Sequence, residues 1–218
     1  MEKYGYHVSK ISPEMAESIK EKGLLTREKV QEILGDNPKF NIPENYPIED
    51  LKKINEIFDQ VKPDSIPFYR KDCVFLEEET VDLLKAKDAF FGKEKGRFIK
   101  VKLTGNEYVA DLKIIDEALN LAKRLKGPVQ TPLGKFFGWE PEPQISEQEF
   151  TNQNMELAKN YWGGCLKIDN LYEYYEKEDS GVWTKKQDTP NELPKHIQWP
   201  EILVPTGVEK EYIEIVEM

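Results

Sequence analysis

Cysteine and histidine are scarce in this 218-residue chain, which has two of each. Cys73 and Cys165 are too few for a disulfide framework, and with two histidines far apart in sequence they lack the spacing of a structural zinc site. We therefore expect no metal. Long apolar runs are also absent, so we expect no membrane segment. Residues 1–7 carry charge and have no apolar signal-peptide core, which favours a cytoplasmic protein.

Several motifs of nucleotide and acyl chemistry are missing as well. No Gly-rich phosphate loop follows an expected strand, and there is no Gly-x-Ser-x-Gly nucleophile elbow. Because the chain has only two histidines, few residues could carry out histidine-based acid–base chemistry. If the chain is an enzyme, we expect its chemistry to rest on positioning and on a carboxylate.

The net charge of −10 is concentrated towards the carboxyl end of the chain. Residues 140–218 contain 17 acidic and 7 basic residues, whereas residues 1–139 contain equal numbers of both. This distribution argues against non-specific nucleic-acid binding, which needs clustered Lys and Arg. The one basic segment, residues 85–102, is either a solvated loop and strand face or a local patch for an anionic substrate.

Short strand patterns mix irregularly with amphipathic helices, which predicts an α+β fold in a single domain over residues 1–218, with a helical amino-terminal part. The expected strands are residues 4–9, 73–76, 97–103, 108–110, 181–184, 201–204 and 212–216. The expected helices are residues 12–23, 26–35, 48–61, 77–86, 112–125 and 146–162. Ser146 and Glu149 form a capping-box pattern at the start of the last helix. The Pro- and Gly-rich residues 127–143 are expected to form a long ordered loop.

Glu201 is the strongest candidate for a catalytic residue. It opens the apolar strand Glu-Ile-Leu-Val between Pro200 and Pro205. An acid in that position is costly unless it lies at an edge or has a partner. A carboxylate at the mouth of a strand suits the stabilisation of an oxocarbenium-like sugar. The alternative is a solvated residue that simply begins a strand.

Other candidates for binding lie in or beside expected strands. His7 can donate to a ribose hydroxyl, or it can be an ordinary hydrogen-bonded strand histidine. Tyr69 and Arg70 can supply an aromatic stack and a phosphate clamp, or Arg70 can be an exposed residue paired with a neighbour. Tyr161 and Trp162, at the end of a helix, are expected to pack in the core.

Three short segments follow one another in a recognisable order. They are Tyr6-His7-Val8-Ser9 with a helix ending in Gly23-Leu24; Ile66-Pro-Phe-Tyr-Arg-Lys-Asp-Cys-Val-Phe-Leu76; and Glu201-Ile-Leu-Val with a final strand at residues 212–215. This order resembles the ADP-ribosyltransferase superfamily, in particular bacterial toxin-type transferases, including those that modify DNA. The resemblance extends over nearly the whole chain, although each matching segment is short.

The resemblance implies an ADP-ribosyltransferase-like split sheet with a cleft that binds NAD as a substrate. It implies that Glu201 polarises the ribose 2′-hydroxyl, that His7 contacts a ribose and that Tyr69 or Phe75 packs on nicotinamide. The implied cofactor-binding residues are His7, Ser9, Tyr69, Arg70 and Phe75. The ADP-ribosyl group would pass to water or to a protein or nucleic-acid acceptor. A toxin of this type can also have an antitoxin or another protein partner.

The residues before Glu201 leave the acceptor open. Gln198 and Trp199 precede it in place of a second acidic residue that would direct transfer to arginine. An RNA 2′-phosphotransferase-like enzyme is an alternative, although such chemistry usually needs several Arg residues and this chain has only four. They are Arg27, Arg70, Arg97 and Arg124. A second alternative is a catalytically degenerate interaction module, which the acidic tail and the tyrosines at 172–175 favour.

Overall fold

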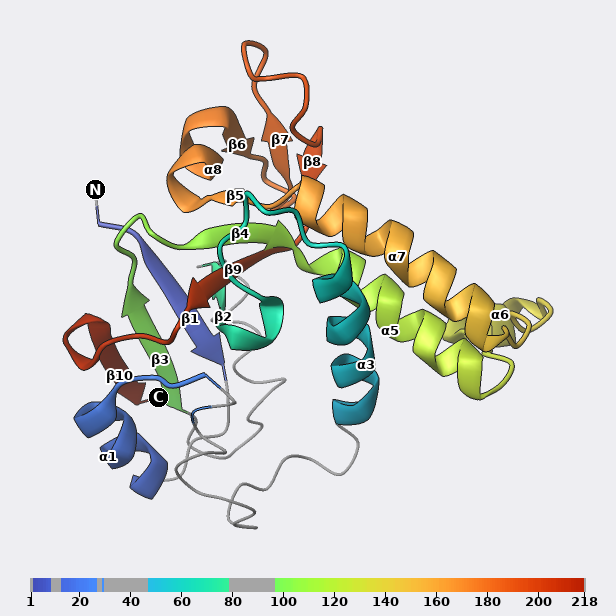
Figure 1. The fold of residues 1–218 in the computed structure, drawn as a ribbon, viewed down its shortest axis with the longest axis horizontal. Helices are drawn as coiled ribbons and strands as arrows, with labels where there is room; N and C mark the ends of the chain where they lie inside the picture. The colour runs from blue at the N-terminus through green and yellow to red at the C-terminus, as the bar shows by residue number, and fades with distance from the viewer. Residues whose placement is uncertain (1, 9–12, 27–28, 30–46, 79–96, 218) are drawn as a thin grey trace.

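The computed structural model describes residues 2–8, 13–26, 29, 47–78 and 97–217 (Figure 1). Within these ranges the chain has the predicted α+β class. It contains six helices, a seven-stranded antiparallel sheet and a small three-stranded sheet. Most of the helix expected at residues 26–35 and most of the one expected at 77–86 lie outside the described residues.

The large sheet has the strand order β10-β3-β1-β2-β9-β4-β5. Its strands are β1 Tyr4–Val8, β2 Cys73–Glu78, β3 Arg97–Lys102, β4 Tyr108–Asp111, β5 Leu166–Lys167, β9 Pro200–Pro205 and β10 Ile213–Glu217. The small sheet contains β6 Tyr175–Lys177, β7 Trp183–Lys185 and β8 His196–Ile197. Because β1 and β10 both pair with β3, the two ends of the chain lie in neighbouring parts of one sheet.

The described helices are α1 Pro13–Lys22, α3 Ile48–Gln60, α5 Leu112–Lys126, α6 Pro132–Phe137, α7 Glu147–Gly163 and α8 Ile168–Tyr174, with 3₁₀ turns η1 Arg70–Asp72 and η2 Lys210–Tyr212. Four of the described helices, α1, α3, α5 and α7, begin and end largely where the sequence indicates. The predicted capping box is confirmed, since Ser146 and Glu149 exchange hydrogen bonds at the start of α7. Gly23 ends α1 with a φ of +84°, a left-handed conformation that glycine adopts without strain.

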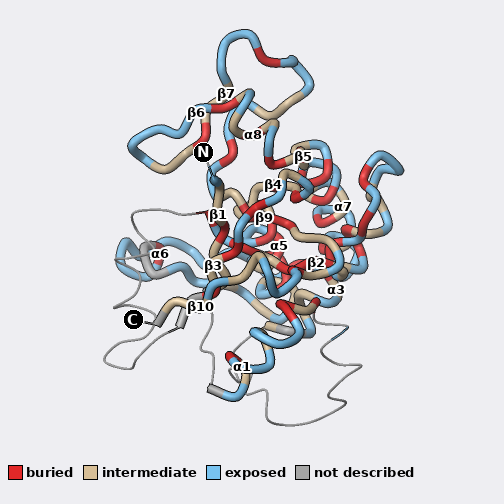
Figure 2. Tube along the Cα trace, turned by 90° about the vertical axis from the view of Figure 1, so that its left-hand side faces the viewer, coloured by how far each residue is buried: buried red, intermediate tan, exposed pale blue. Residues whose placement is uncertain are grey.

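The large sheet has a hydrophobic core on each face, because side chains alternate along its strands. On one face Leu203 packs with α3, α5 and α7, whose buried side chains include Phe58 and Tyr161. On the other face Leu76 and Ile202 pack with α8 and the small sheet. Figure 2 shows the buried residues concentrated around the strands of the large sheet. The sheet is therefore covered on both sides, which limits where polar groups can reach solvent.

Two parts of the predicted secondary structure were wrong. Glu77 and Glu78 continue β2 instead of starting a helix, because Glu77 pairs with strands on both sides and Glu78 pairs with β1. Residues 127–143 contain the helix α6, where the Thr131 hydroxyl accepts from the Gly134 N–H at 3.0 Å and Gly138 ends the helix. The structure also has a helix that the sequence analysis did not assign, since the tyrosine-rich residues 168–174 form α8.

Candidate functional site

A buried ion pair between Arg70 and Glu201 forms the most charged point of the core. One guanidinium nitrogen, Nη2, donates to both Glu201 carboxylate oxygens, at 2.9 and 3.0 Å. Tyr161 accepts from Arg70 Nε at 3.2 Å and donates to Glu201 Oε2 at 3.0 Å. Arg70 is 4% exposed and Glu201 6%. Their charges are therefore shielded from water and joined through a third buried polar group.

Two further side chains complete what we call the Arg70–Glu201 network, which consists of Asn55, Arg70, Phe75, Tyr161 and Glu201. Asn55 Oδ1, on α3, accepts from Arg70 Nη1 at 2.9 Å. The guanidinium carbon lies 4.3 Å from the centre of the Phe75 ring, the distance of a cation–π contact. Every guanidinium nitrogen therefore has a partner, and one guanidinium face has an aromatic cover.

The backbone brings Arg70 to Glu201 through a short turn and a central strand. Pro67 favours an extended chain before it, and the 3₁₀ turn η1 then starts at Arg70. The Arg70 N–H donates to Asp59 Oδ1 on α3 at 3.2 Å, which fixes the turn against that helix. Glu201 stands in β9 between Glu77 of β2 and Ala110 of β4. The pair thus joins residues 131 positions apart in sequence.

In the network, the charged and polar neighbours of Arg70 offset the unfavourable effect of burial on its charged form. Burial disfavours the charged form of Arg70, but Glu201 and Tyr161 outweigh it and raise the pKa of Arg70. Burial, and then the Glu201 charge, raise the pKa of Tyr161 well above its ordinary value, so its hydroxyl keeps its proton. A buried ion pair of this kind is favourable only where further hydrogen bonds satisfy both partners, as they do here.

Glu77 is a second carboxylate on the same sheet face. It lies directly opposite Glu201 across the β2–β9 pair, and Tyr6 of β1 lies opposite it on the other side. Unlike Glu201 it is exposed. Loss of surrounding water, and then the Glu201 charge, raise the pKa of Glu77. Two carboxylates in contrasting environments therefore stand side by side, an arrangement that suits a division between a charged and a protonatable group.

His7 lies on the face of the sheet opposite to Glu201. A Cβ placed on Gly5 would meet Leu76 and Ile202, which fixes the face of Gly5 and, two residues later, that of His7. Glu201 precedes Ile202 and so points the other way. His7 Nδ1 is 3.0 Å from the backbone oxygen of Phe75. Burial lowers the pKa of His7, and the contact with Phe75 opposes that change.

The predicted site residues therefore separate into groups. Arg70, Phe75 and Glu201 come together in one network. Tyr69 is exposed, and the ammonium groups of Lys62 and Lys71 lie 5.1 and 5.8 Å from its ring centre. Its ring is available at the surface beside Arg70 but is not part of the network. Ser9 lies outside the described residues.

Comparisons with protein-family models, with curated proteins and with solved structures found no match for this chain.

Sequence reasoning missed the partners that make the network complete. Tyr161 was expected in the core, where it is fully buried, but its hydroxyl was not given a partner. A buried phenol needs one, and that requirement is a signal that could have linked Tyr161 to a nearby charge. Asn55 interrupts the apolar stripe of α3 between Ile54 and Ile57, a second usable signal. Glu77 was missed because it was assigned to a helix.

The described residues contain no group of three or more His, Cys, Asp or Glu side chains placed to hold a metal ion. Cys73 and Cys165 are free thiols, and burial raises the pKa of Cys165 to about 12. Within the same ranges, no helix has the length and apolar character to cross a membrane. The chemistry that this part of the chain can perform therefore centres on carboxylates, a guanidinium and aromatic rings.

Proposed function

We propose that this chain is an NAD-dependent ADP-ribosyltransferase whose site is built on the Arg70–Glu201 network, with an ADP-ribosyltransferase-like split sheet as its fold. The observation that carries the proposal is the convergence of Arg70, Phe75 and Glu201. These residues come from two distant segments, and the resemblance to ADP-ribosyltransferases implies all three at the NAD site. Their meeting at the junction of β2 and β9 supports one common role.

The chemistry at this junction follows from the charges. Cleavage of the bond between nicotinamide and ribose leaves positive charge on the ribose ring, and neutral nicotinamide departs. The Glu201 carboxylate, held in place by Arg70 and Tyr161, would oppose that charge without having to reorganise. The exposed Glu77 beside it would face the acceptor, which is water or a hydroxyl or amine of a macromolecule. The proposal assigns His7 no contact with Glu201.

A second candidate function is a catalytically degenerate interaction module. Two observations favour it: both oxygens of Glu201 already have partners, and His7 lies on the opposite face of the sheet. In this alternative the Arg70–Glu201 network only fixes the packing of α3 and α7 against the sheet. The chain would then act through its surface and would neither bind nor cleave NAD.

Release of nicotinamide from NAD by the purified chain separates the two candidates. The transferase proposal predicts nicotinamide release by the wild type and at least about a hundredfold slower release by Glu201→Gln, the size of effect seen when one transition-state electrostatic group is lost. Glu214→Gln, on the edge strand β10, is the matched control and should keep the wild-type rate. Circular dichroism of both variants checks that they fold.

Two results would decide against the transferase. If the wild type released no nicotinamide, the interaction module would become the better account. If Glu201→Gln were folded and as active as the wild type, the carboxylate would have no part in the chemistry.

A further inference from the structure

Three large aromatic side chains stand exposed on α6 and the residue after its cap. Phe136 is 81% exposed, Phe137 59% and Trp139 61%. They lie against one another, since the ring centres of Phe136 and Phe137 are 5.0 Å apart and those of Phe137 and Trp139 are 5.5 Å apart. We call these three residues the aromatic tip. A contiguous apolar patch of this kind on a surface marks a place of association.

The loop beneath the aromatic tip is built to hold it in place. Val129 and Glu142 form an isolated antiparallel bridge that closes the base of the loop. Within it, Gln130 Nε2 donates to the Trp139 backbone oxygen at 2.9 Å, and Thr131 caps α6. Gly138 turns the chain in the left-handed region, with a φ of +68°. The rings are therefore presented by a defined backbone, which lowers the entropy cost of binding.

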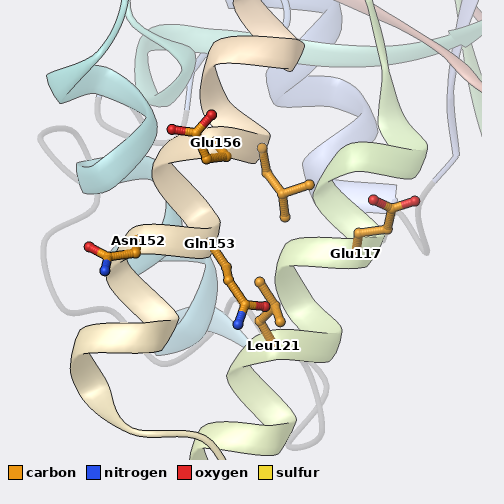
Figure 3. Close-up of a pocket in the computed structure, with 6 residues that line it drawn as sticks. Glu117, Leu121, Asn152, Gln153 and Glu156 are labelled. Atoms are coloured by element: carbon orange, nitrogen blue, oxygen red, sulfur yellow. The ribbon is translucent and has the colours of Figure 1, made fainter.

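A shallow groove between α5 and α7 offers a complementary surface on the same molecule. Its volume is about 440 Å³. It is lined by Glu117, Leu121, Asn152, Gln153, Glu156 and Leu157, which we call the helical groove. In Figure 3 Leu121 lies between the two helices beside Gln153, and Glu117 on α5 and Glu156 on α7 lie farther along the groove, on its two sides. The groove thus has an apolar floor and a carboxylate on each side; Glu156 pairs with Lys159 at 2.5 Å and Glu117 with Lys113 at 4.0 Å.

We propose that the aromatic tip of one chain docks into the helical groove of a second copy of this chain. Beside the tip on α6 lies one lysine, Lys135, which is exposed and has no ion-pair partner among the residues that the structure describes. Its charge complements Glu117, whose ion pair with Lys113 is 4.0 Å long, and the aromatic rings complement Leu121 and Leu157 on the floor of the groove. The two surfaces therefore complement each other in apolar character and, at Glu117, in charge.

The positions of the aromatic tip and the helical groove favour a closed dimer over an open-ended polymer of copies. Figure 1 shows α6 at the end of the α5–α7 hairpin that points away from the sheet. Leu121, in the groove, precedes Gly127 at the start of the tip loop by six positions on the same hairpin. A two-fold axis across two hairpins can therefore bring each tip over the other copy's groove. Such a contact is self-complementary and ends at a dimer.

The net charge makes an anionic membrane a poor occupant of the tip. A protein with a charge of −10 is repelled by acidic lipid surfaces, and a second copy carries the same net charge, so the choice between them depends on local contacts. Docking into a second copy sets Lys135 beside the Glu117 carboxylate and the aromatic rings on apolar side chains. Self-association also covers the tip and the groove together.

Sedimentation velocity of the full chain, from micromolar to millimolar concentration, tests the dimer. We expect a monomer–dimer equilibrium in which Trp139→Ser and Phe136→Ser each weaken association at least about tenfold, as is usual for a buried interface aromatic. Circular dichroism should show both variants folded, because the substituted side chains are at the surface. A monomer at every concentration, or a dimer unaffected by both substitutions, would overturn the proposal.

A charge exchange tests the groove itself. Lys135→Glu should weaken the dimer, because it sets a like charge against Glu117 of the other copy. Adding Glu117→Lys to the same chain should restore association, since each contact then again joins opposite charges. Failure of the second substitution to restore the dimer would show that the tip does not dock into this groove.

Discussion

The Arg70–Glu201 network and the aromatic tip depart from the usual distribution of side chains in opposite ways. The network places two full charges in the core, and the tip places three large apolar rings in solvent. In the network every charge has a partner in the same chain, and these contacts offset the free-energy cost of burying the charges. The rings of the tip contact only one another among the described aromatic pairs. The polar groups of the network thus find their partners within one chain, whereas the rings of the tip become buried only in the proposed dimer.

The largest predicted effect on the free energy of unfolding is that of Arg70→Met, in the network. Loss of the guanidinium leaves the Glu201 carboxylate buried and unpaired, which should lower the free energy of unfolding by about 3–5 kcal/mol. Urea denaturation measures it. The matched control is Arg70→Met with Glu201→Leu, which removes both charges and should recover most of the loss. A double variant as unstable as the single one would show that the charges themselves are not the cause.

A smaller effect is expected from Tyr161→Phe. This change keeps the ring in the core but removes the hydroxyl that joins Arg70 Nε to Glu201 Oε2. The loss of unfolding free energy should be about 1–3 kcal/mol, the cost of leaving buried polar groups less satisfied. Denaturation of Tyr175→Phe, which removes a buried-ring hydroxyl bonded to the Pro194 oxygen, gives a comparison outside the network. If Tyr161→Phe and Tyr175→Phe lost equal free energies of unfolding, the Tyr161 hydroxyl would contribute no more than an ordinary buried hydrogen bond.

Glu77 should make stability depend on pH in a direction that its pKa fixes. The folded protein raises this pKa above the unfolded value, so Glu77 favours the fold below the unfolded pKa and loses that contribution as pH rises through the folded pKa. Glu77→Gln should therefore be more stable than the wild type at neutral pH, and the difference should shrink in acid. Thermal unfolding between about pH 3 and about pH 8, with the exposed Glu173→Gln as control, measures the difference. A constant difference across this range would contradict the assignment.

The smallest effect on stability is expected at the aromatic tip. Phe136→Ser should change the free energy of unfolding of the monomer by no more than about 0.5 kcal/mol, as for most surface positions. Urea denaturation at a concentration low enough to keep the chain monomeric measures this. A loss as large as that of Arg70→Met would mean that Phe136 packs into the fold instead of serving a second chain.

Much of the local structure could be predicted from this sequence, because local signals set it. The capping box at Ser146 and the glycine stop at Gly23 were both read from residues within one helical turn. The same holds for the apolar face of α5. The helix α6 was missed although Thr131-Pro132 and Gly138 are ordinary helix-end signals, since the Pro and Gly content of the segment favoured a loop.

The candidate site could be predicted only in part, because strand order decides it. Glu201 and Arg70 were named from their local context and Phe75 from the family resemblance, but nothing in the local context shows that β2 and β9 are neighbours. The face of His7 depends on the register of β1 with β2 and β3, which a single sequence does not specify. Glu77 became a site candidate only once β2 was seen to extend to Glu78.

Calorimetric titration of NAD into the wild type and into Phe75→Leu tests the central claim most directly. Leucine keeps an apolar side chain beside Arg70 and leaves the ion pair with Glu201 in place, but it removes the aromatic ring from the proposed NAD site. The account predicts that the wild type binds NAD, that Phe75→Leu binds it at least about tenfold more weakly, and that Phe136→Ser at the aromatic tip binds it unchanged. No binding by the wild type, or equal binding by the wild type and Phe75→Leu, would contradict it.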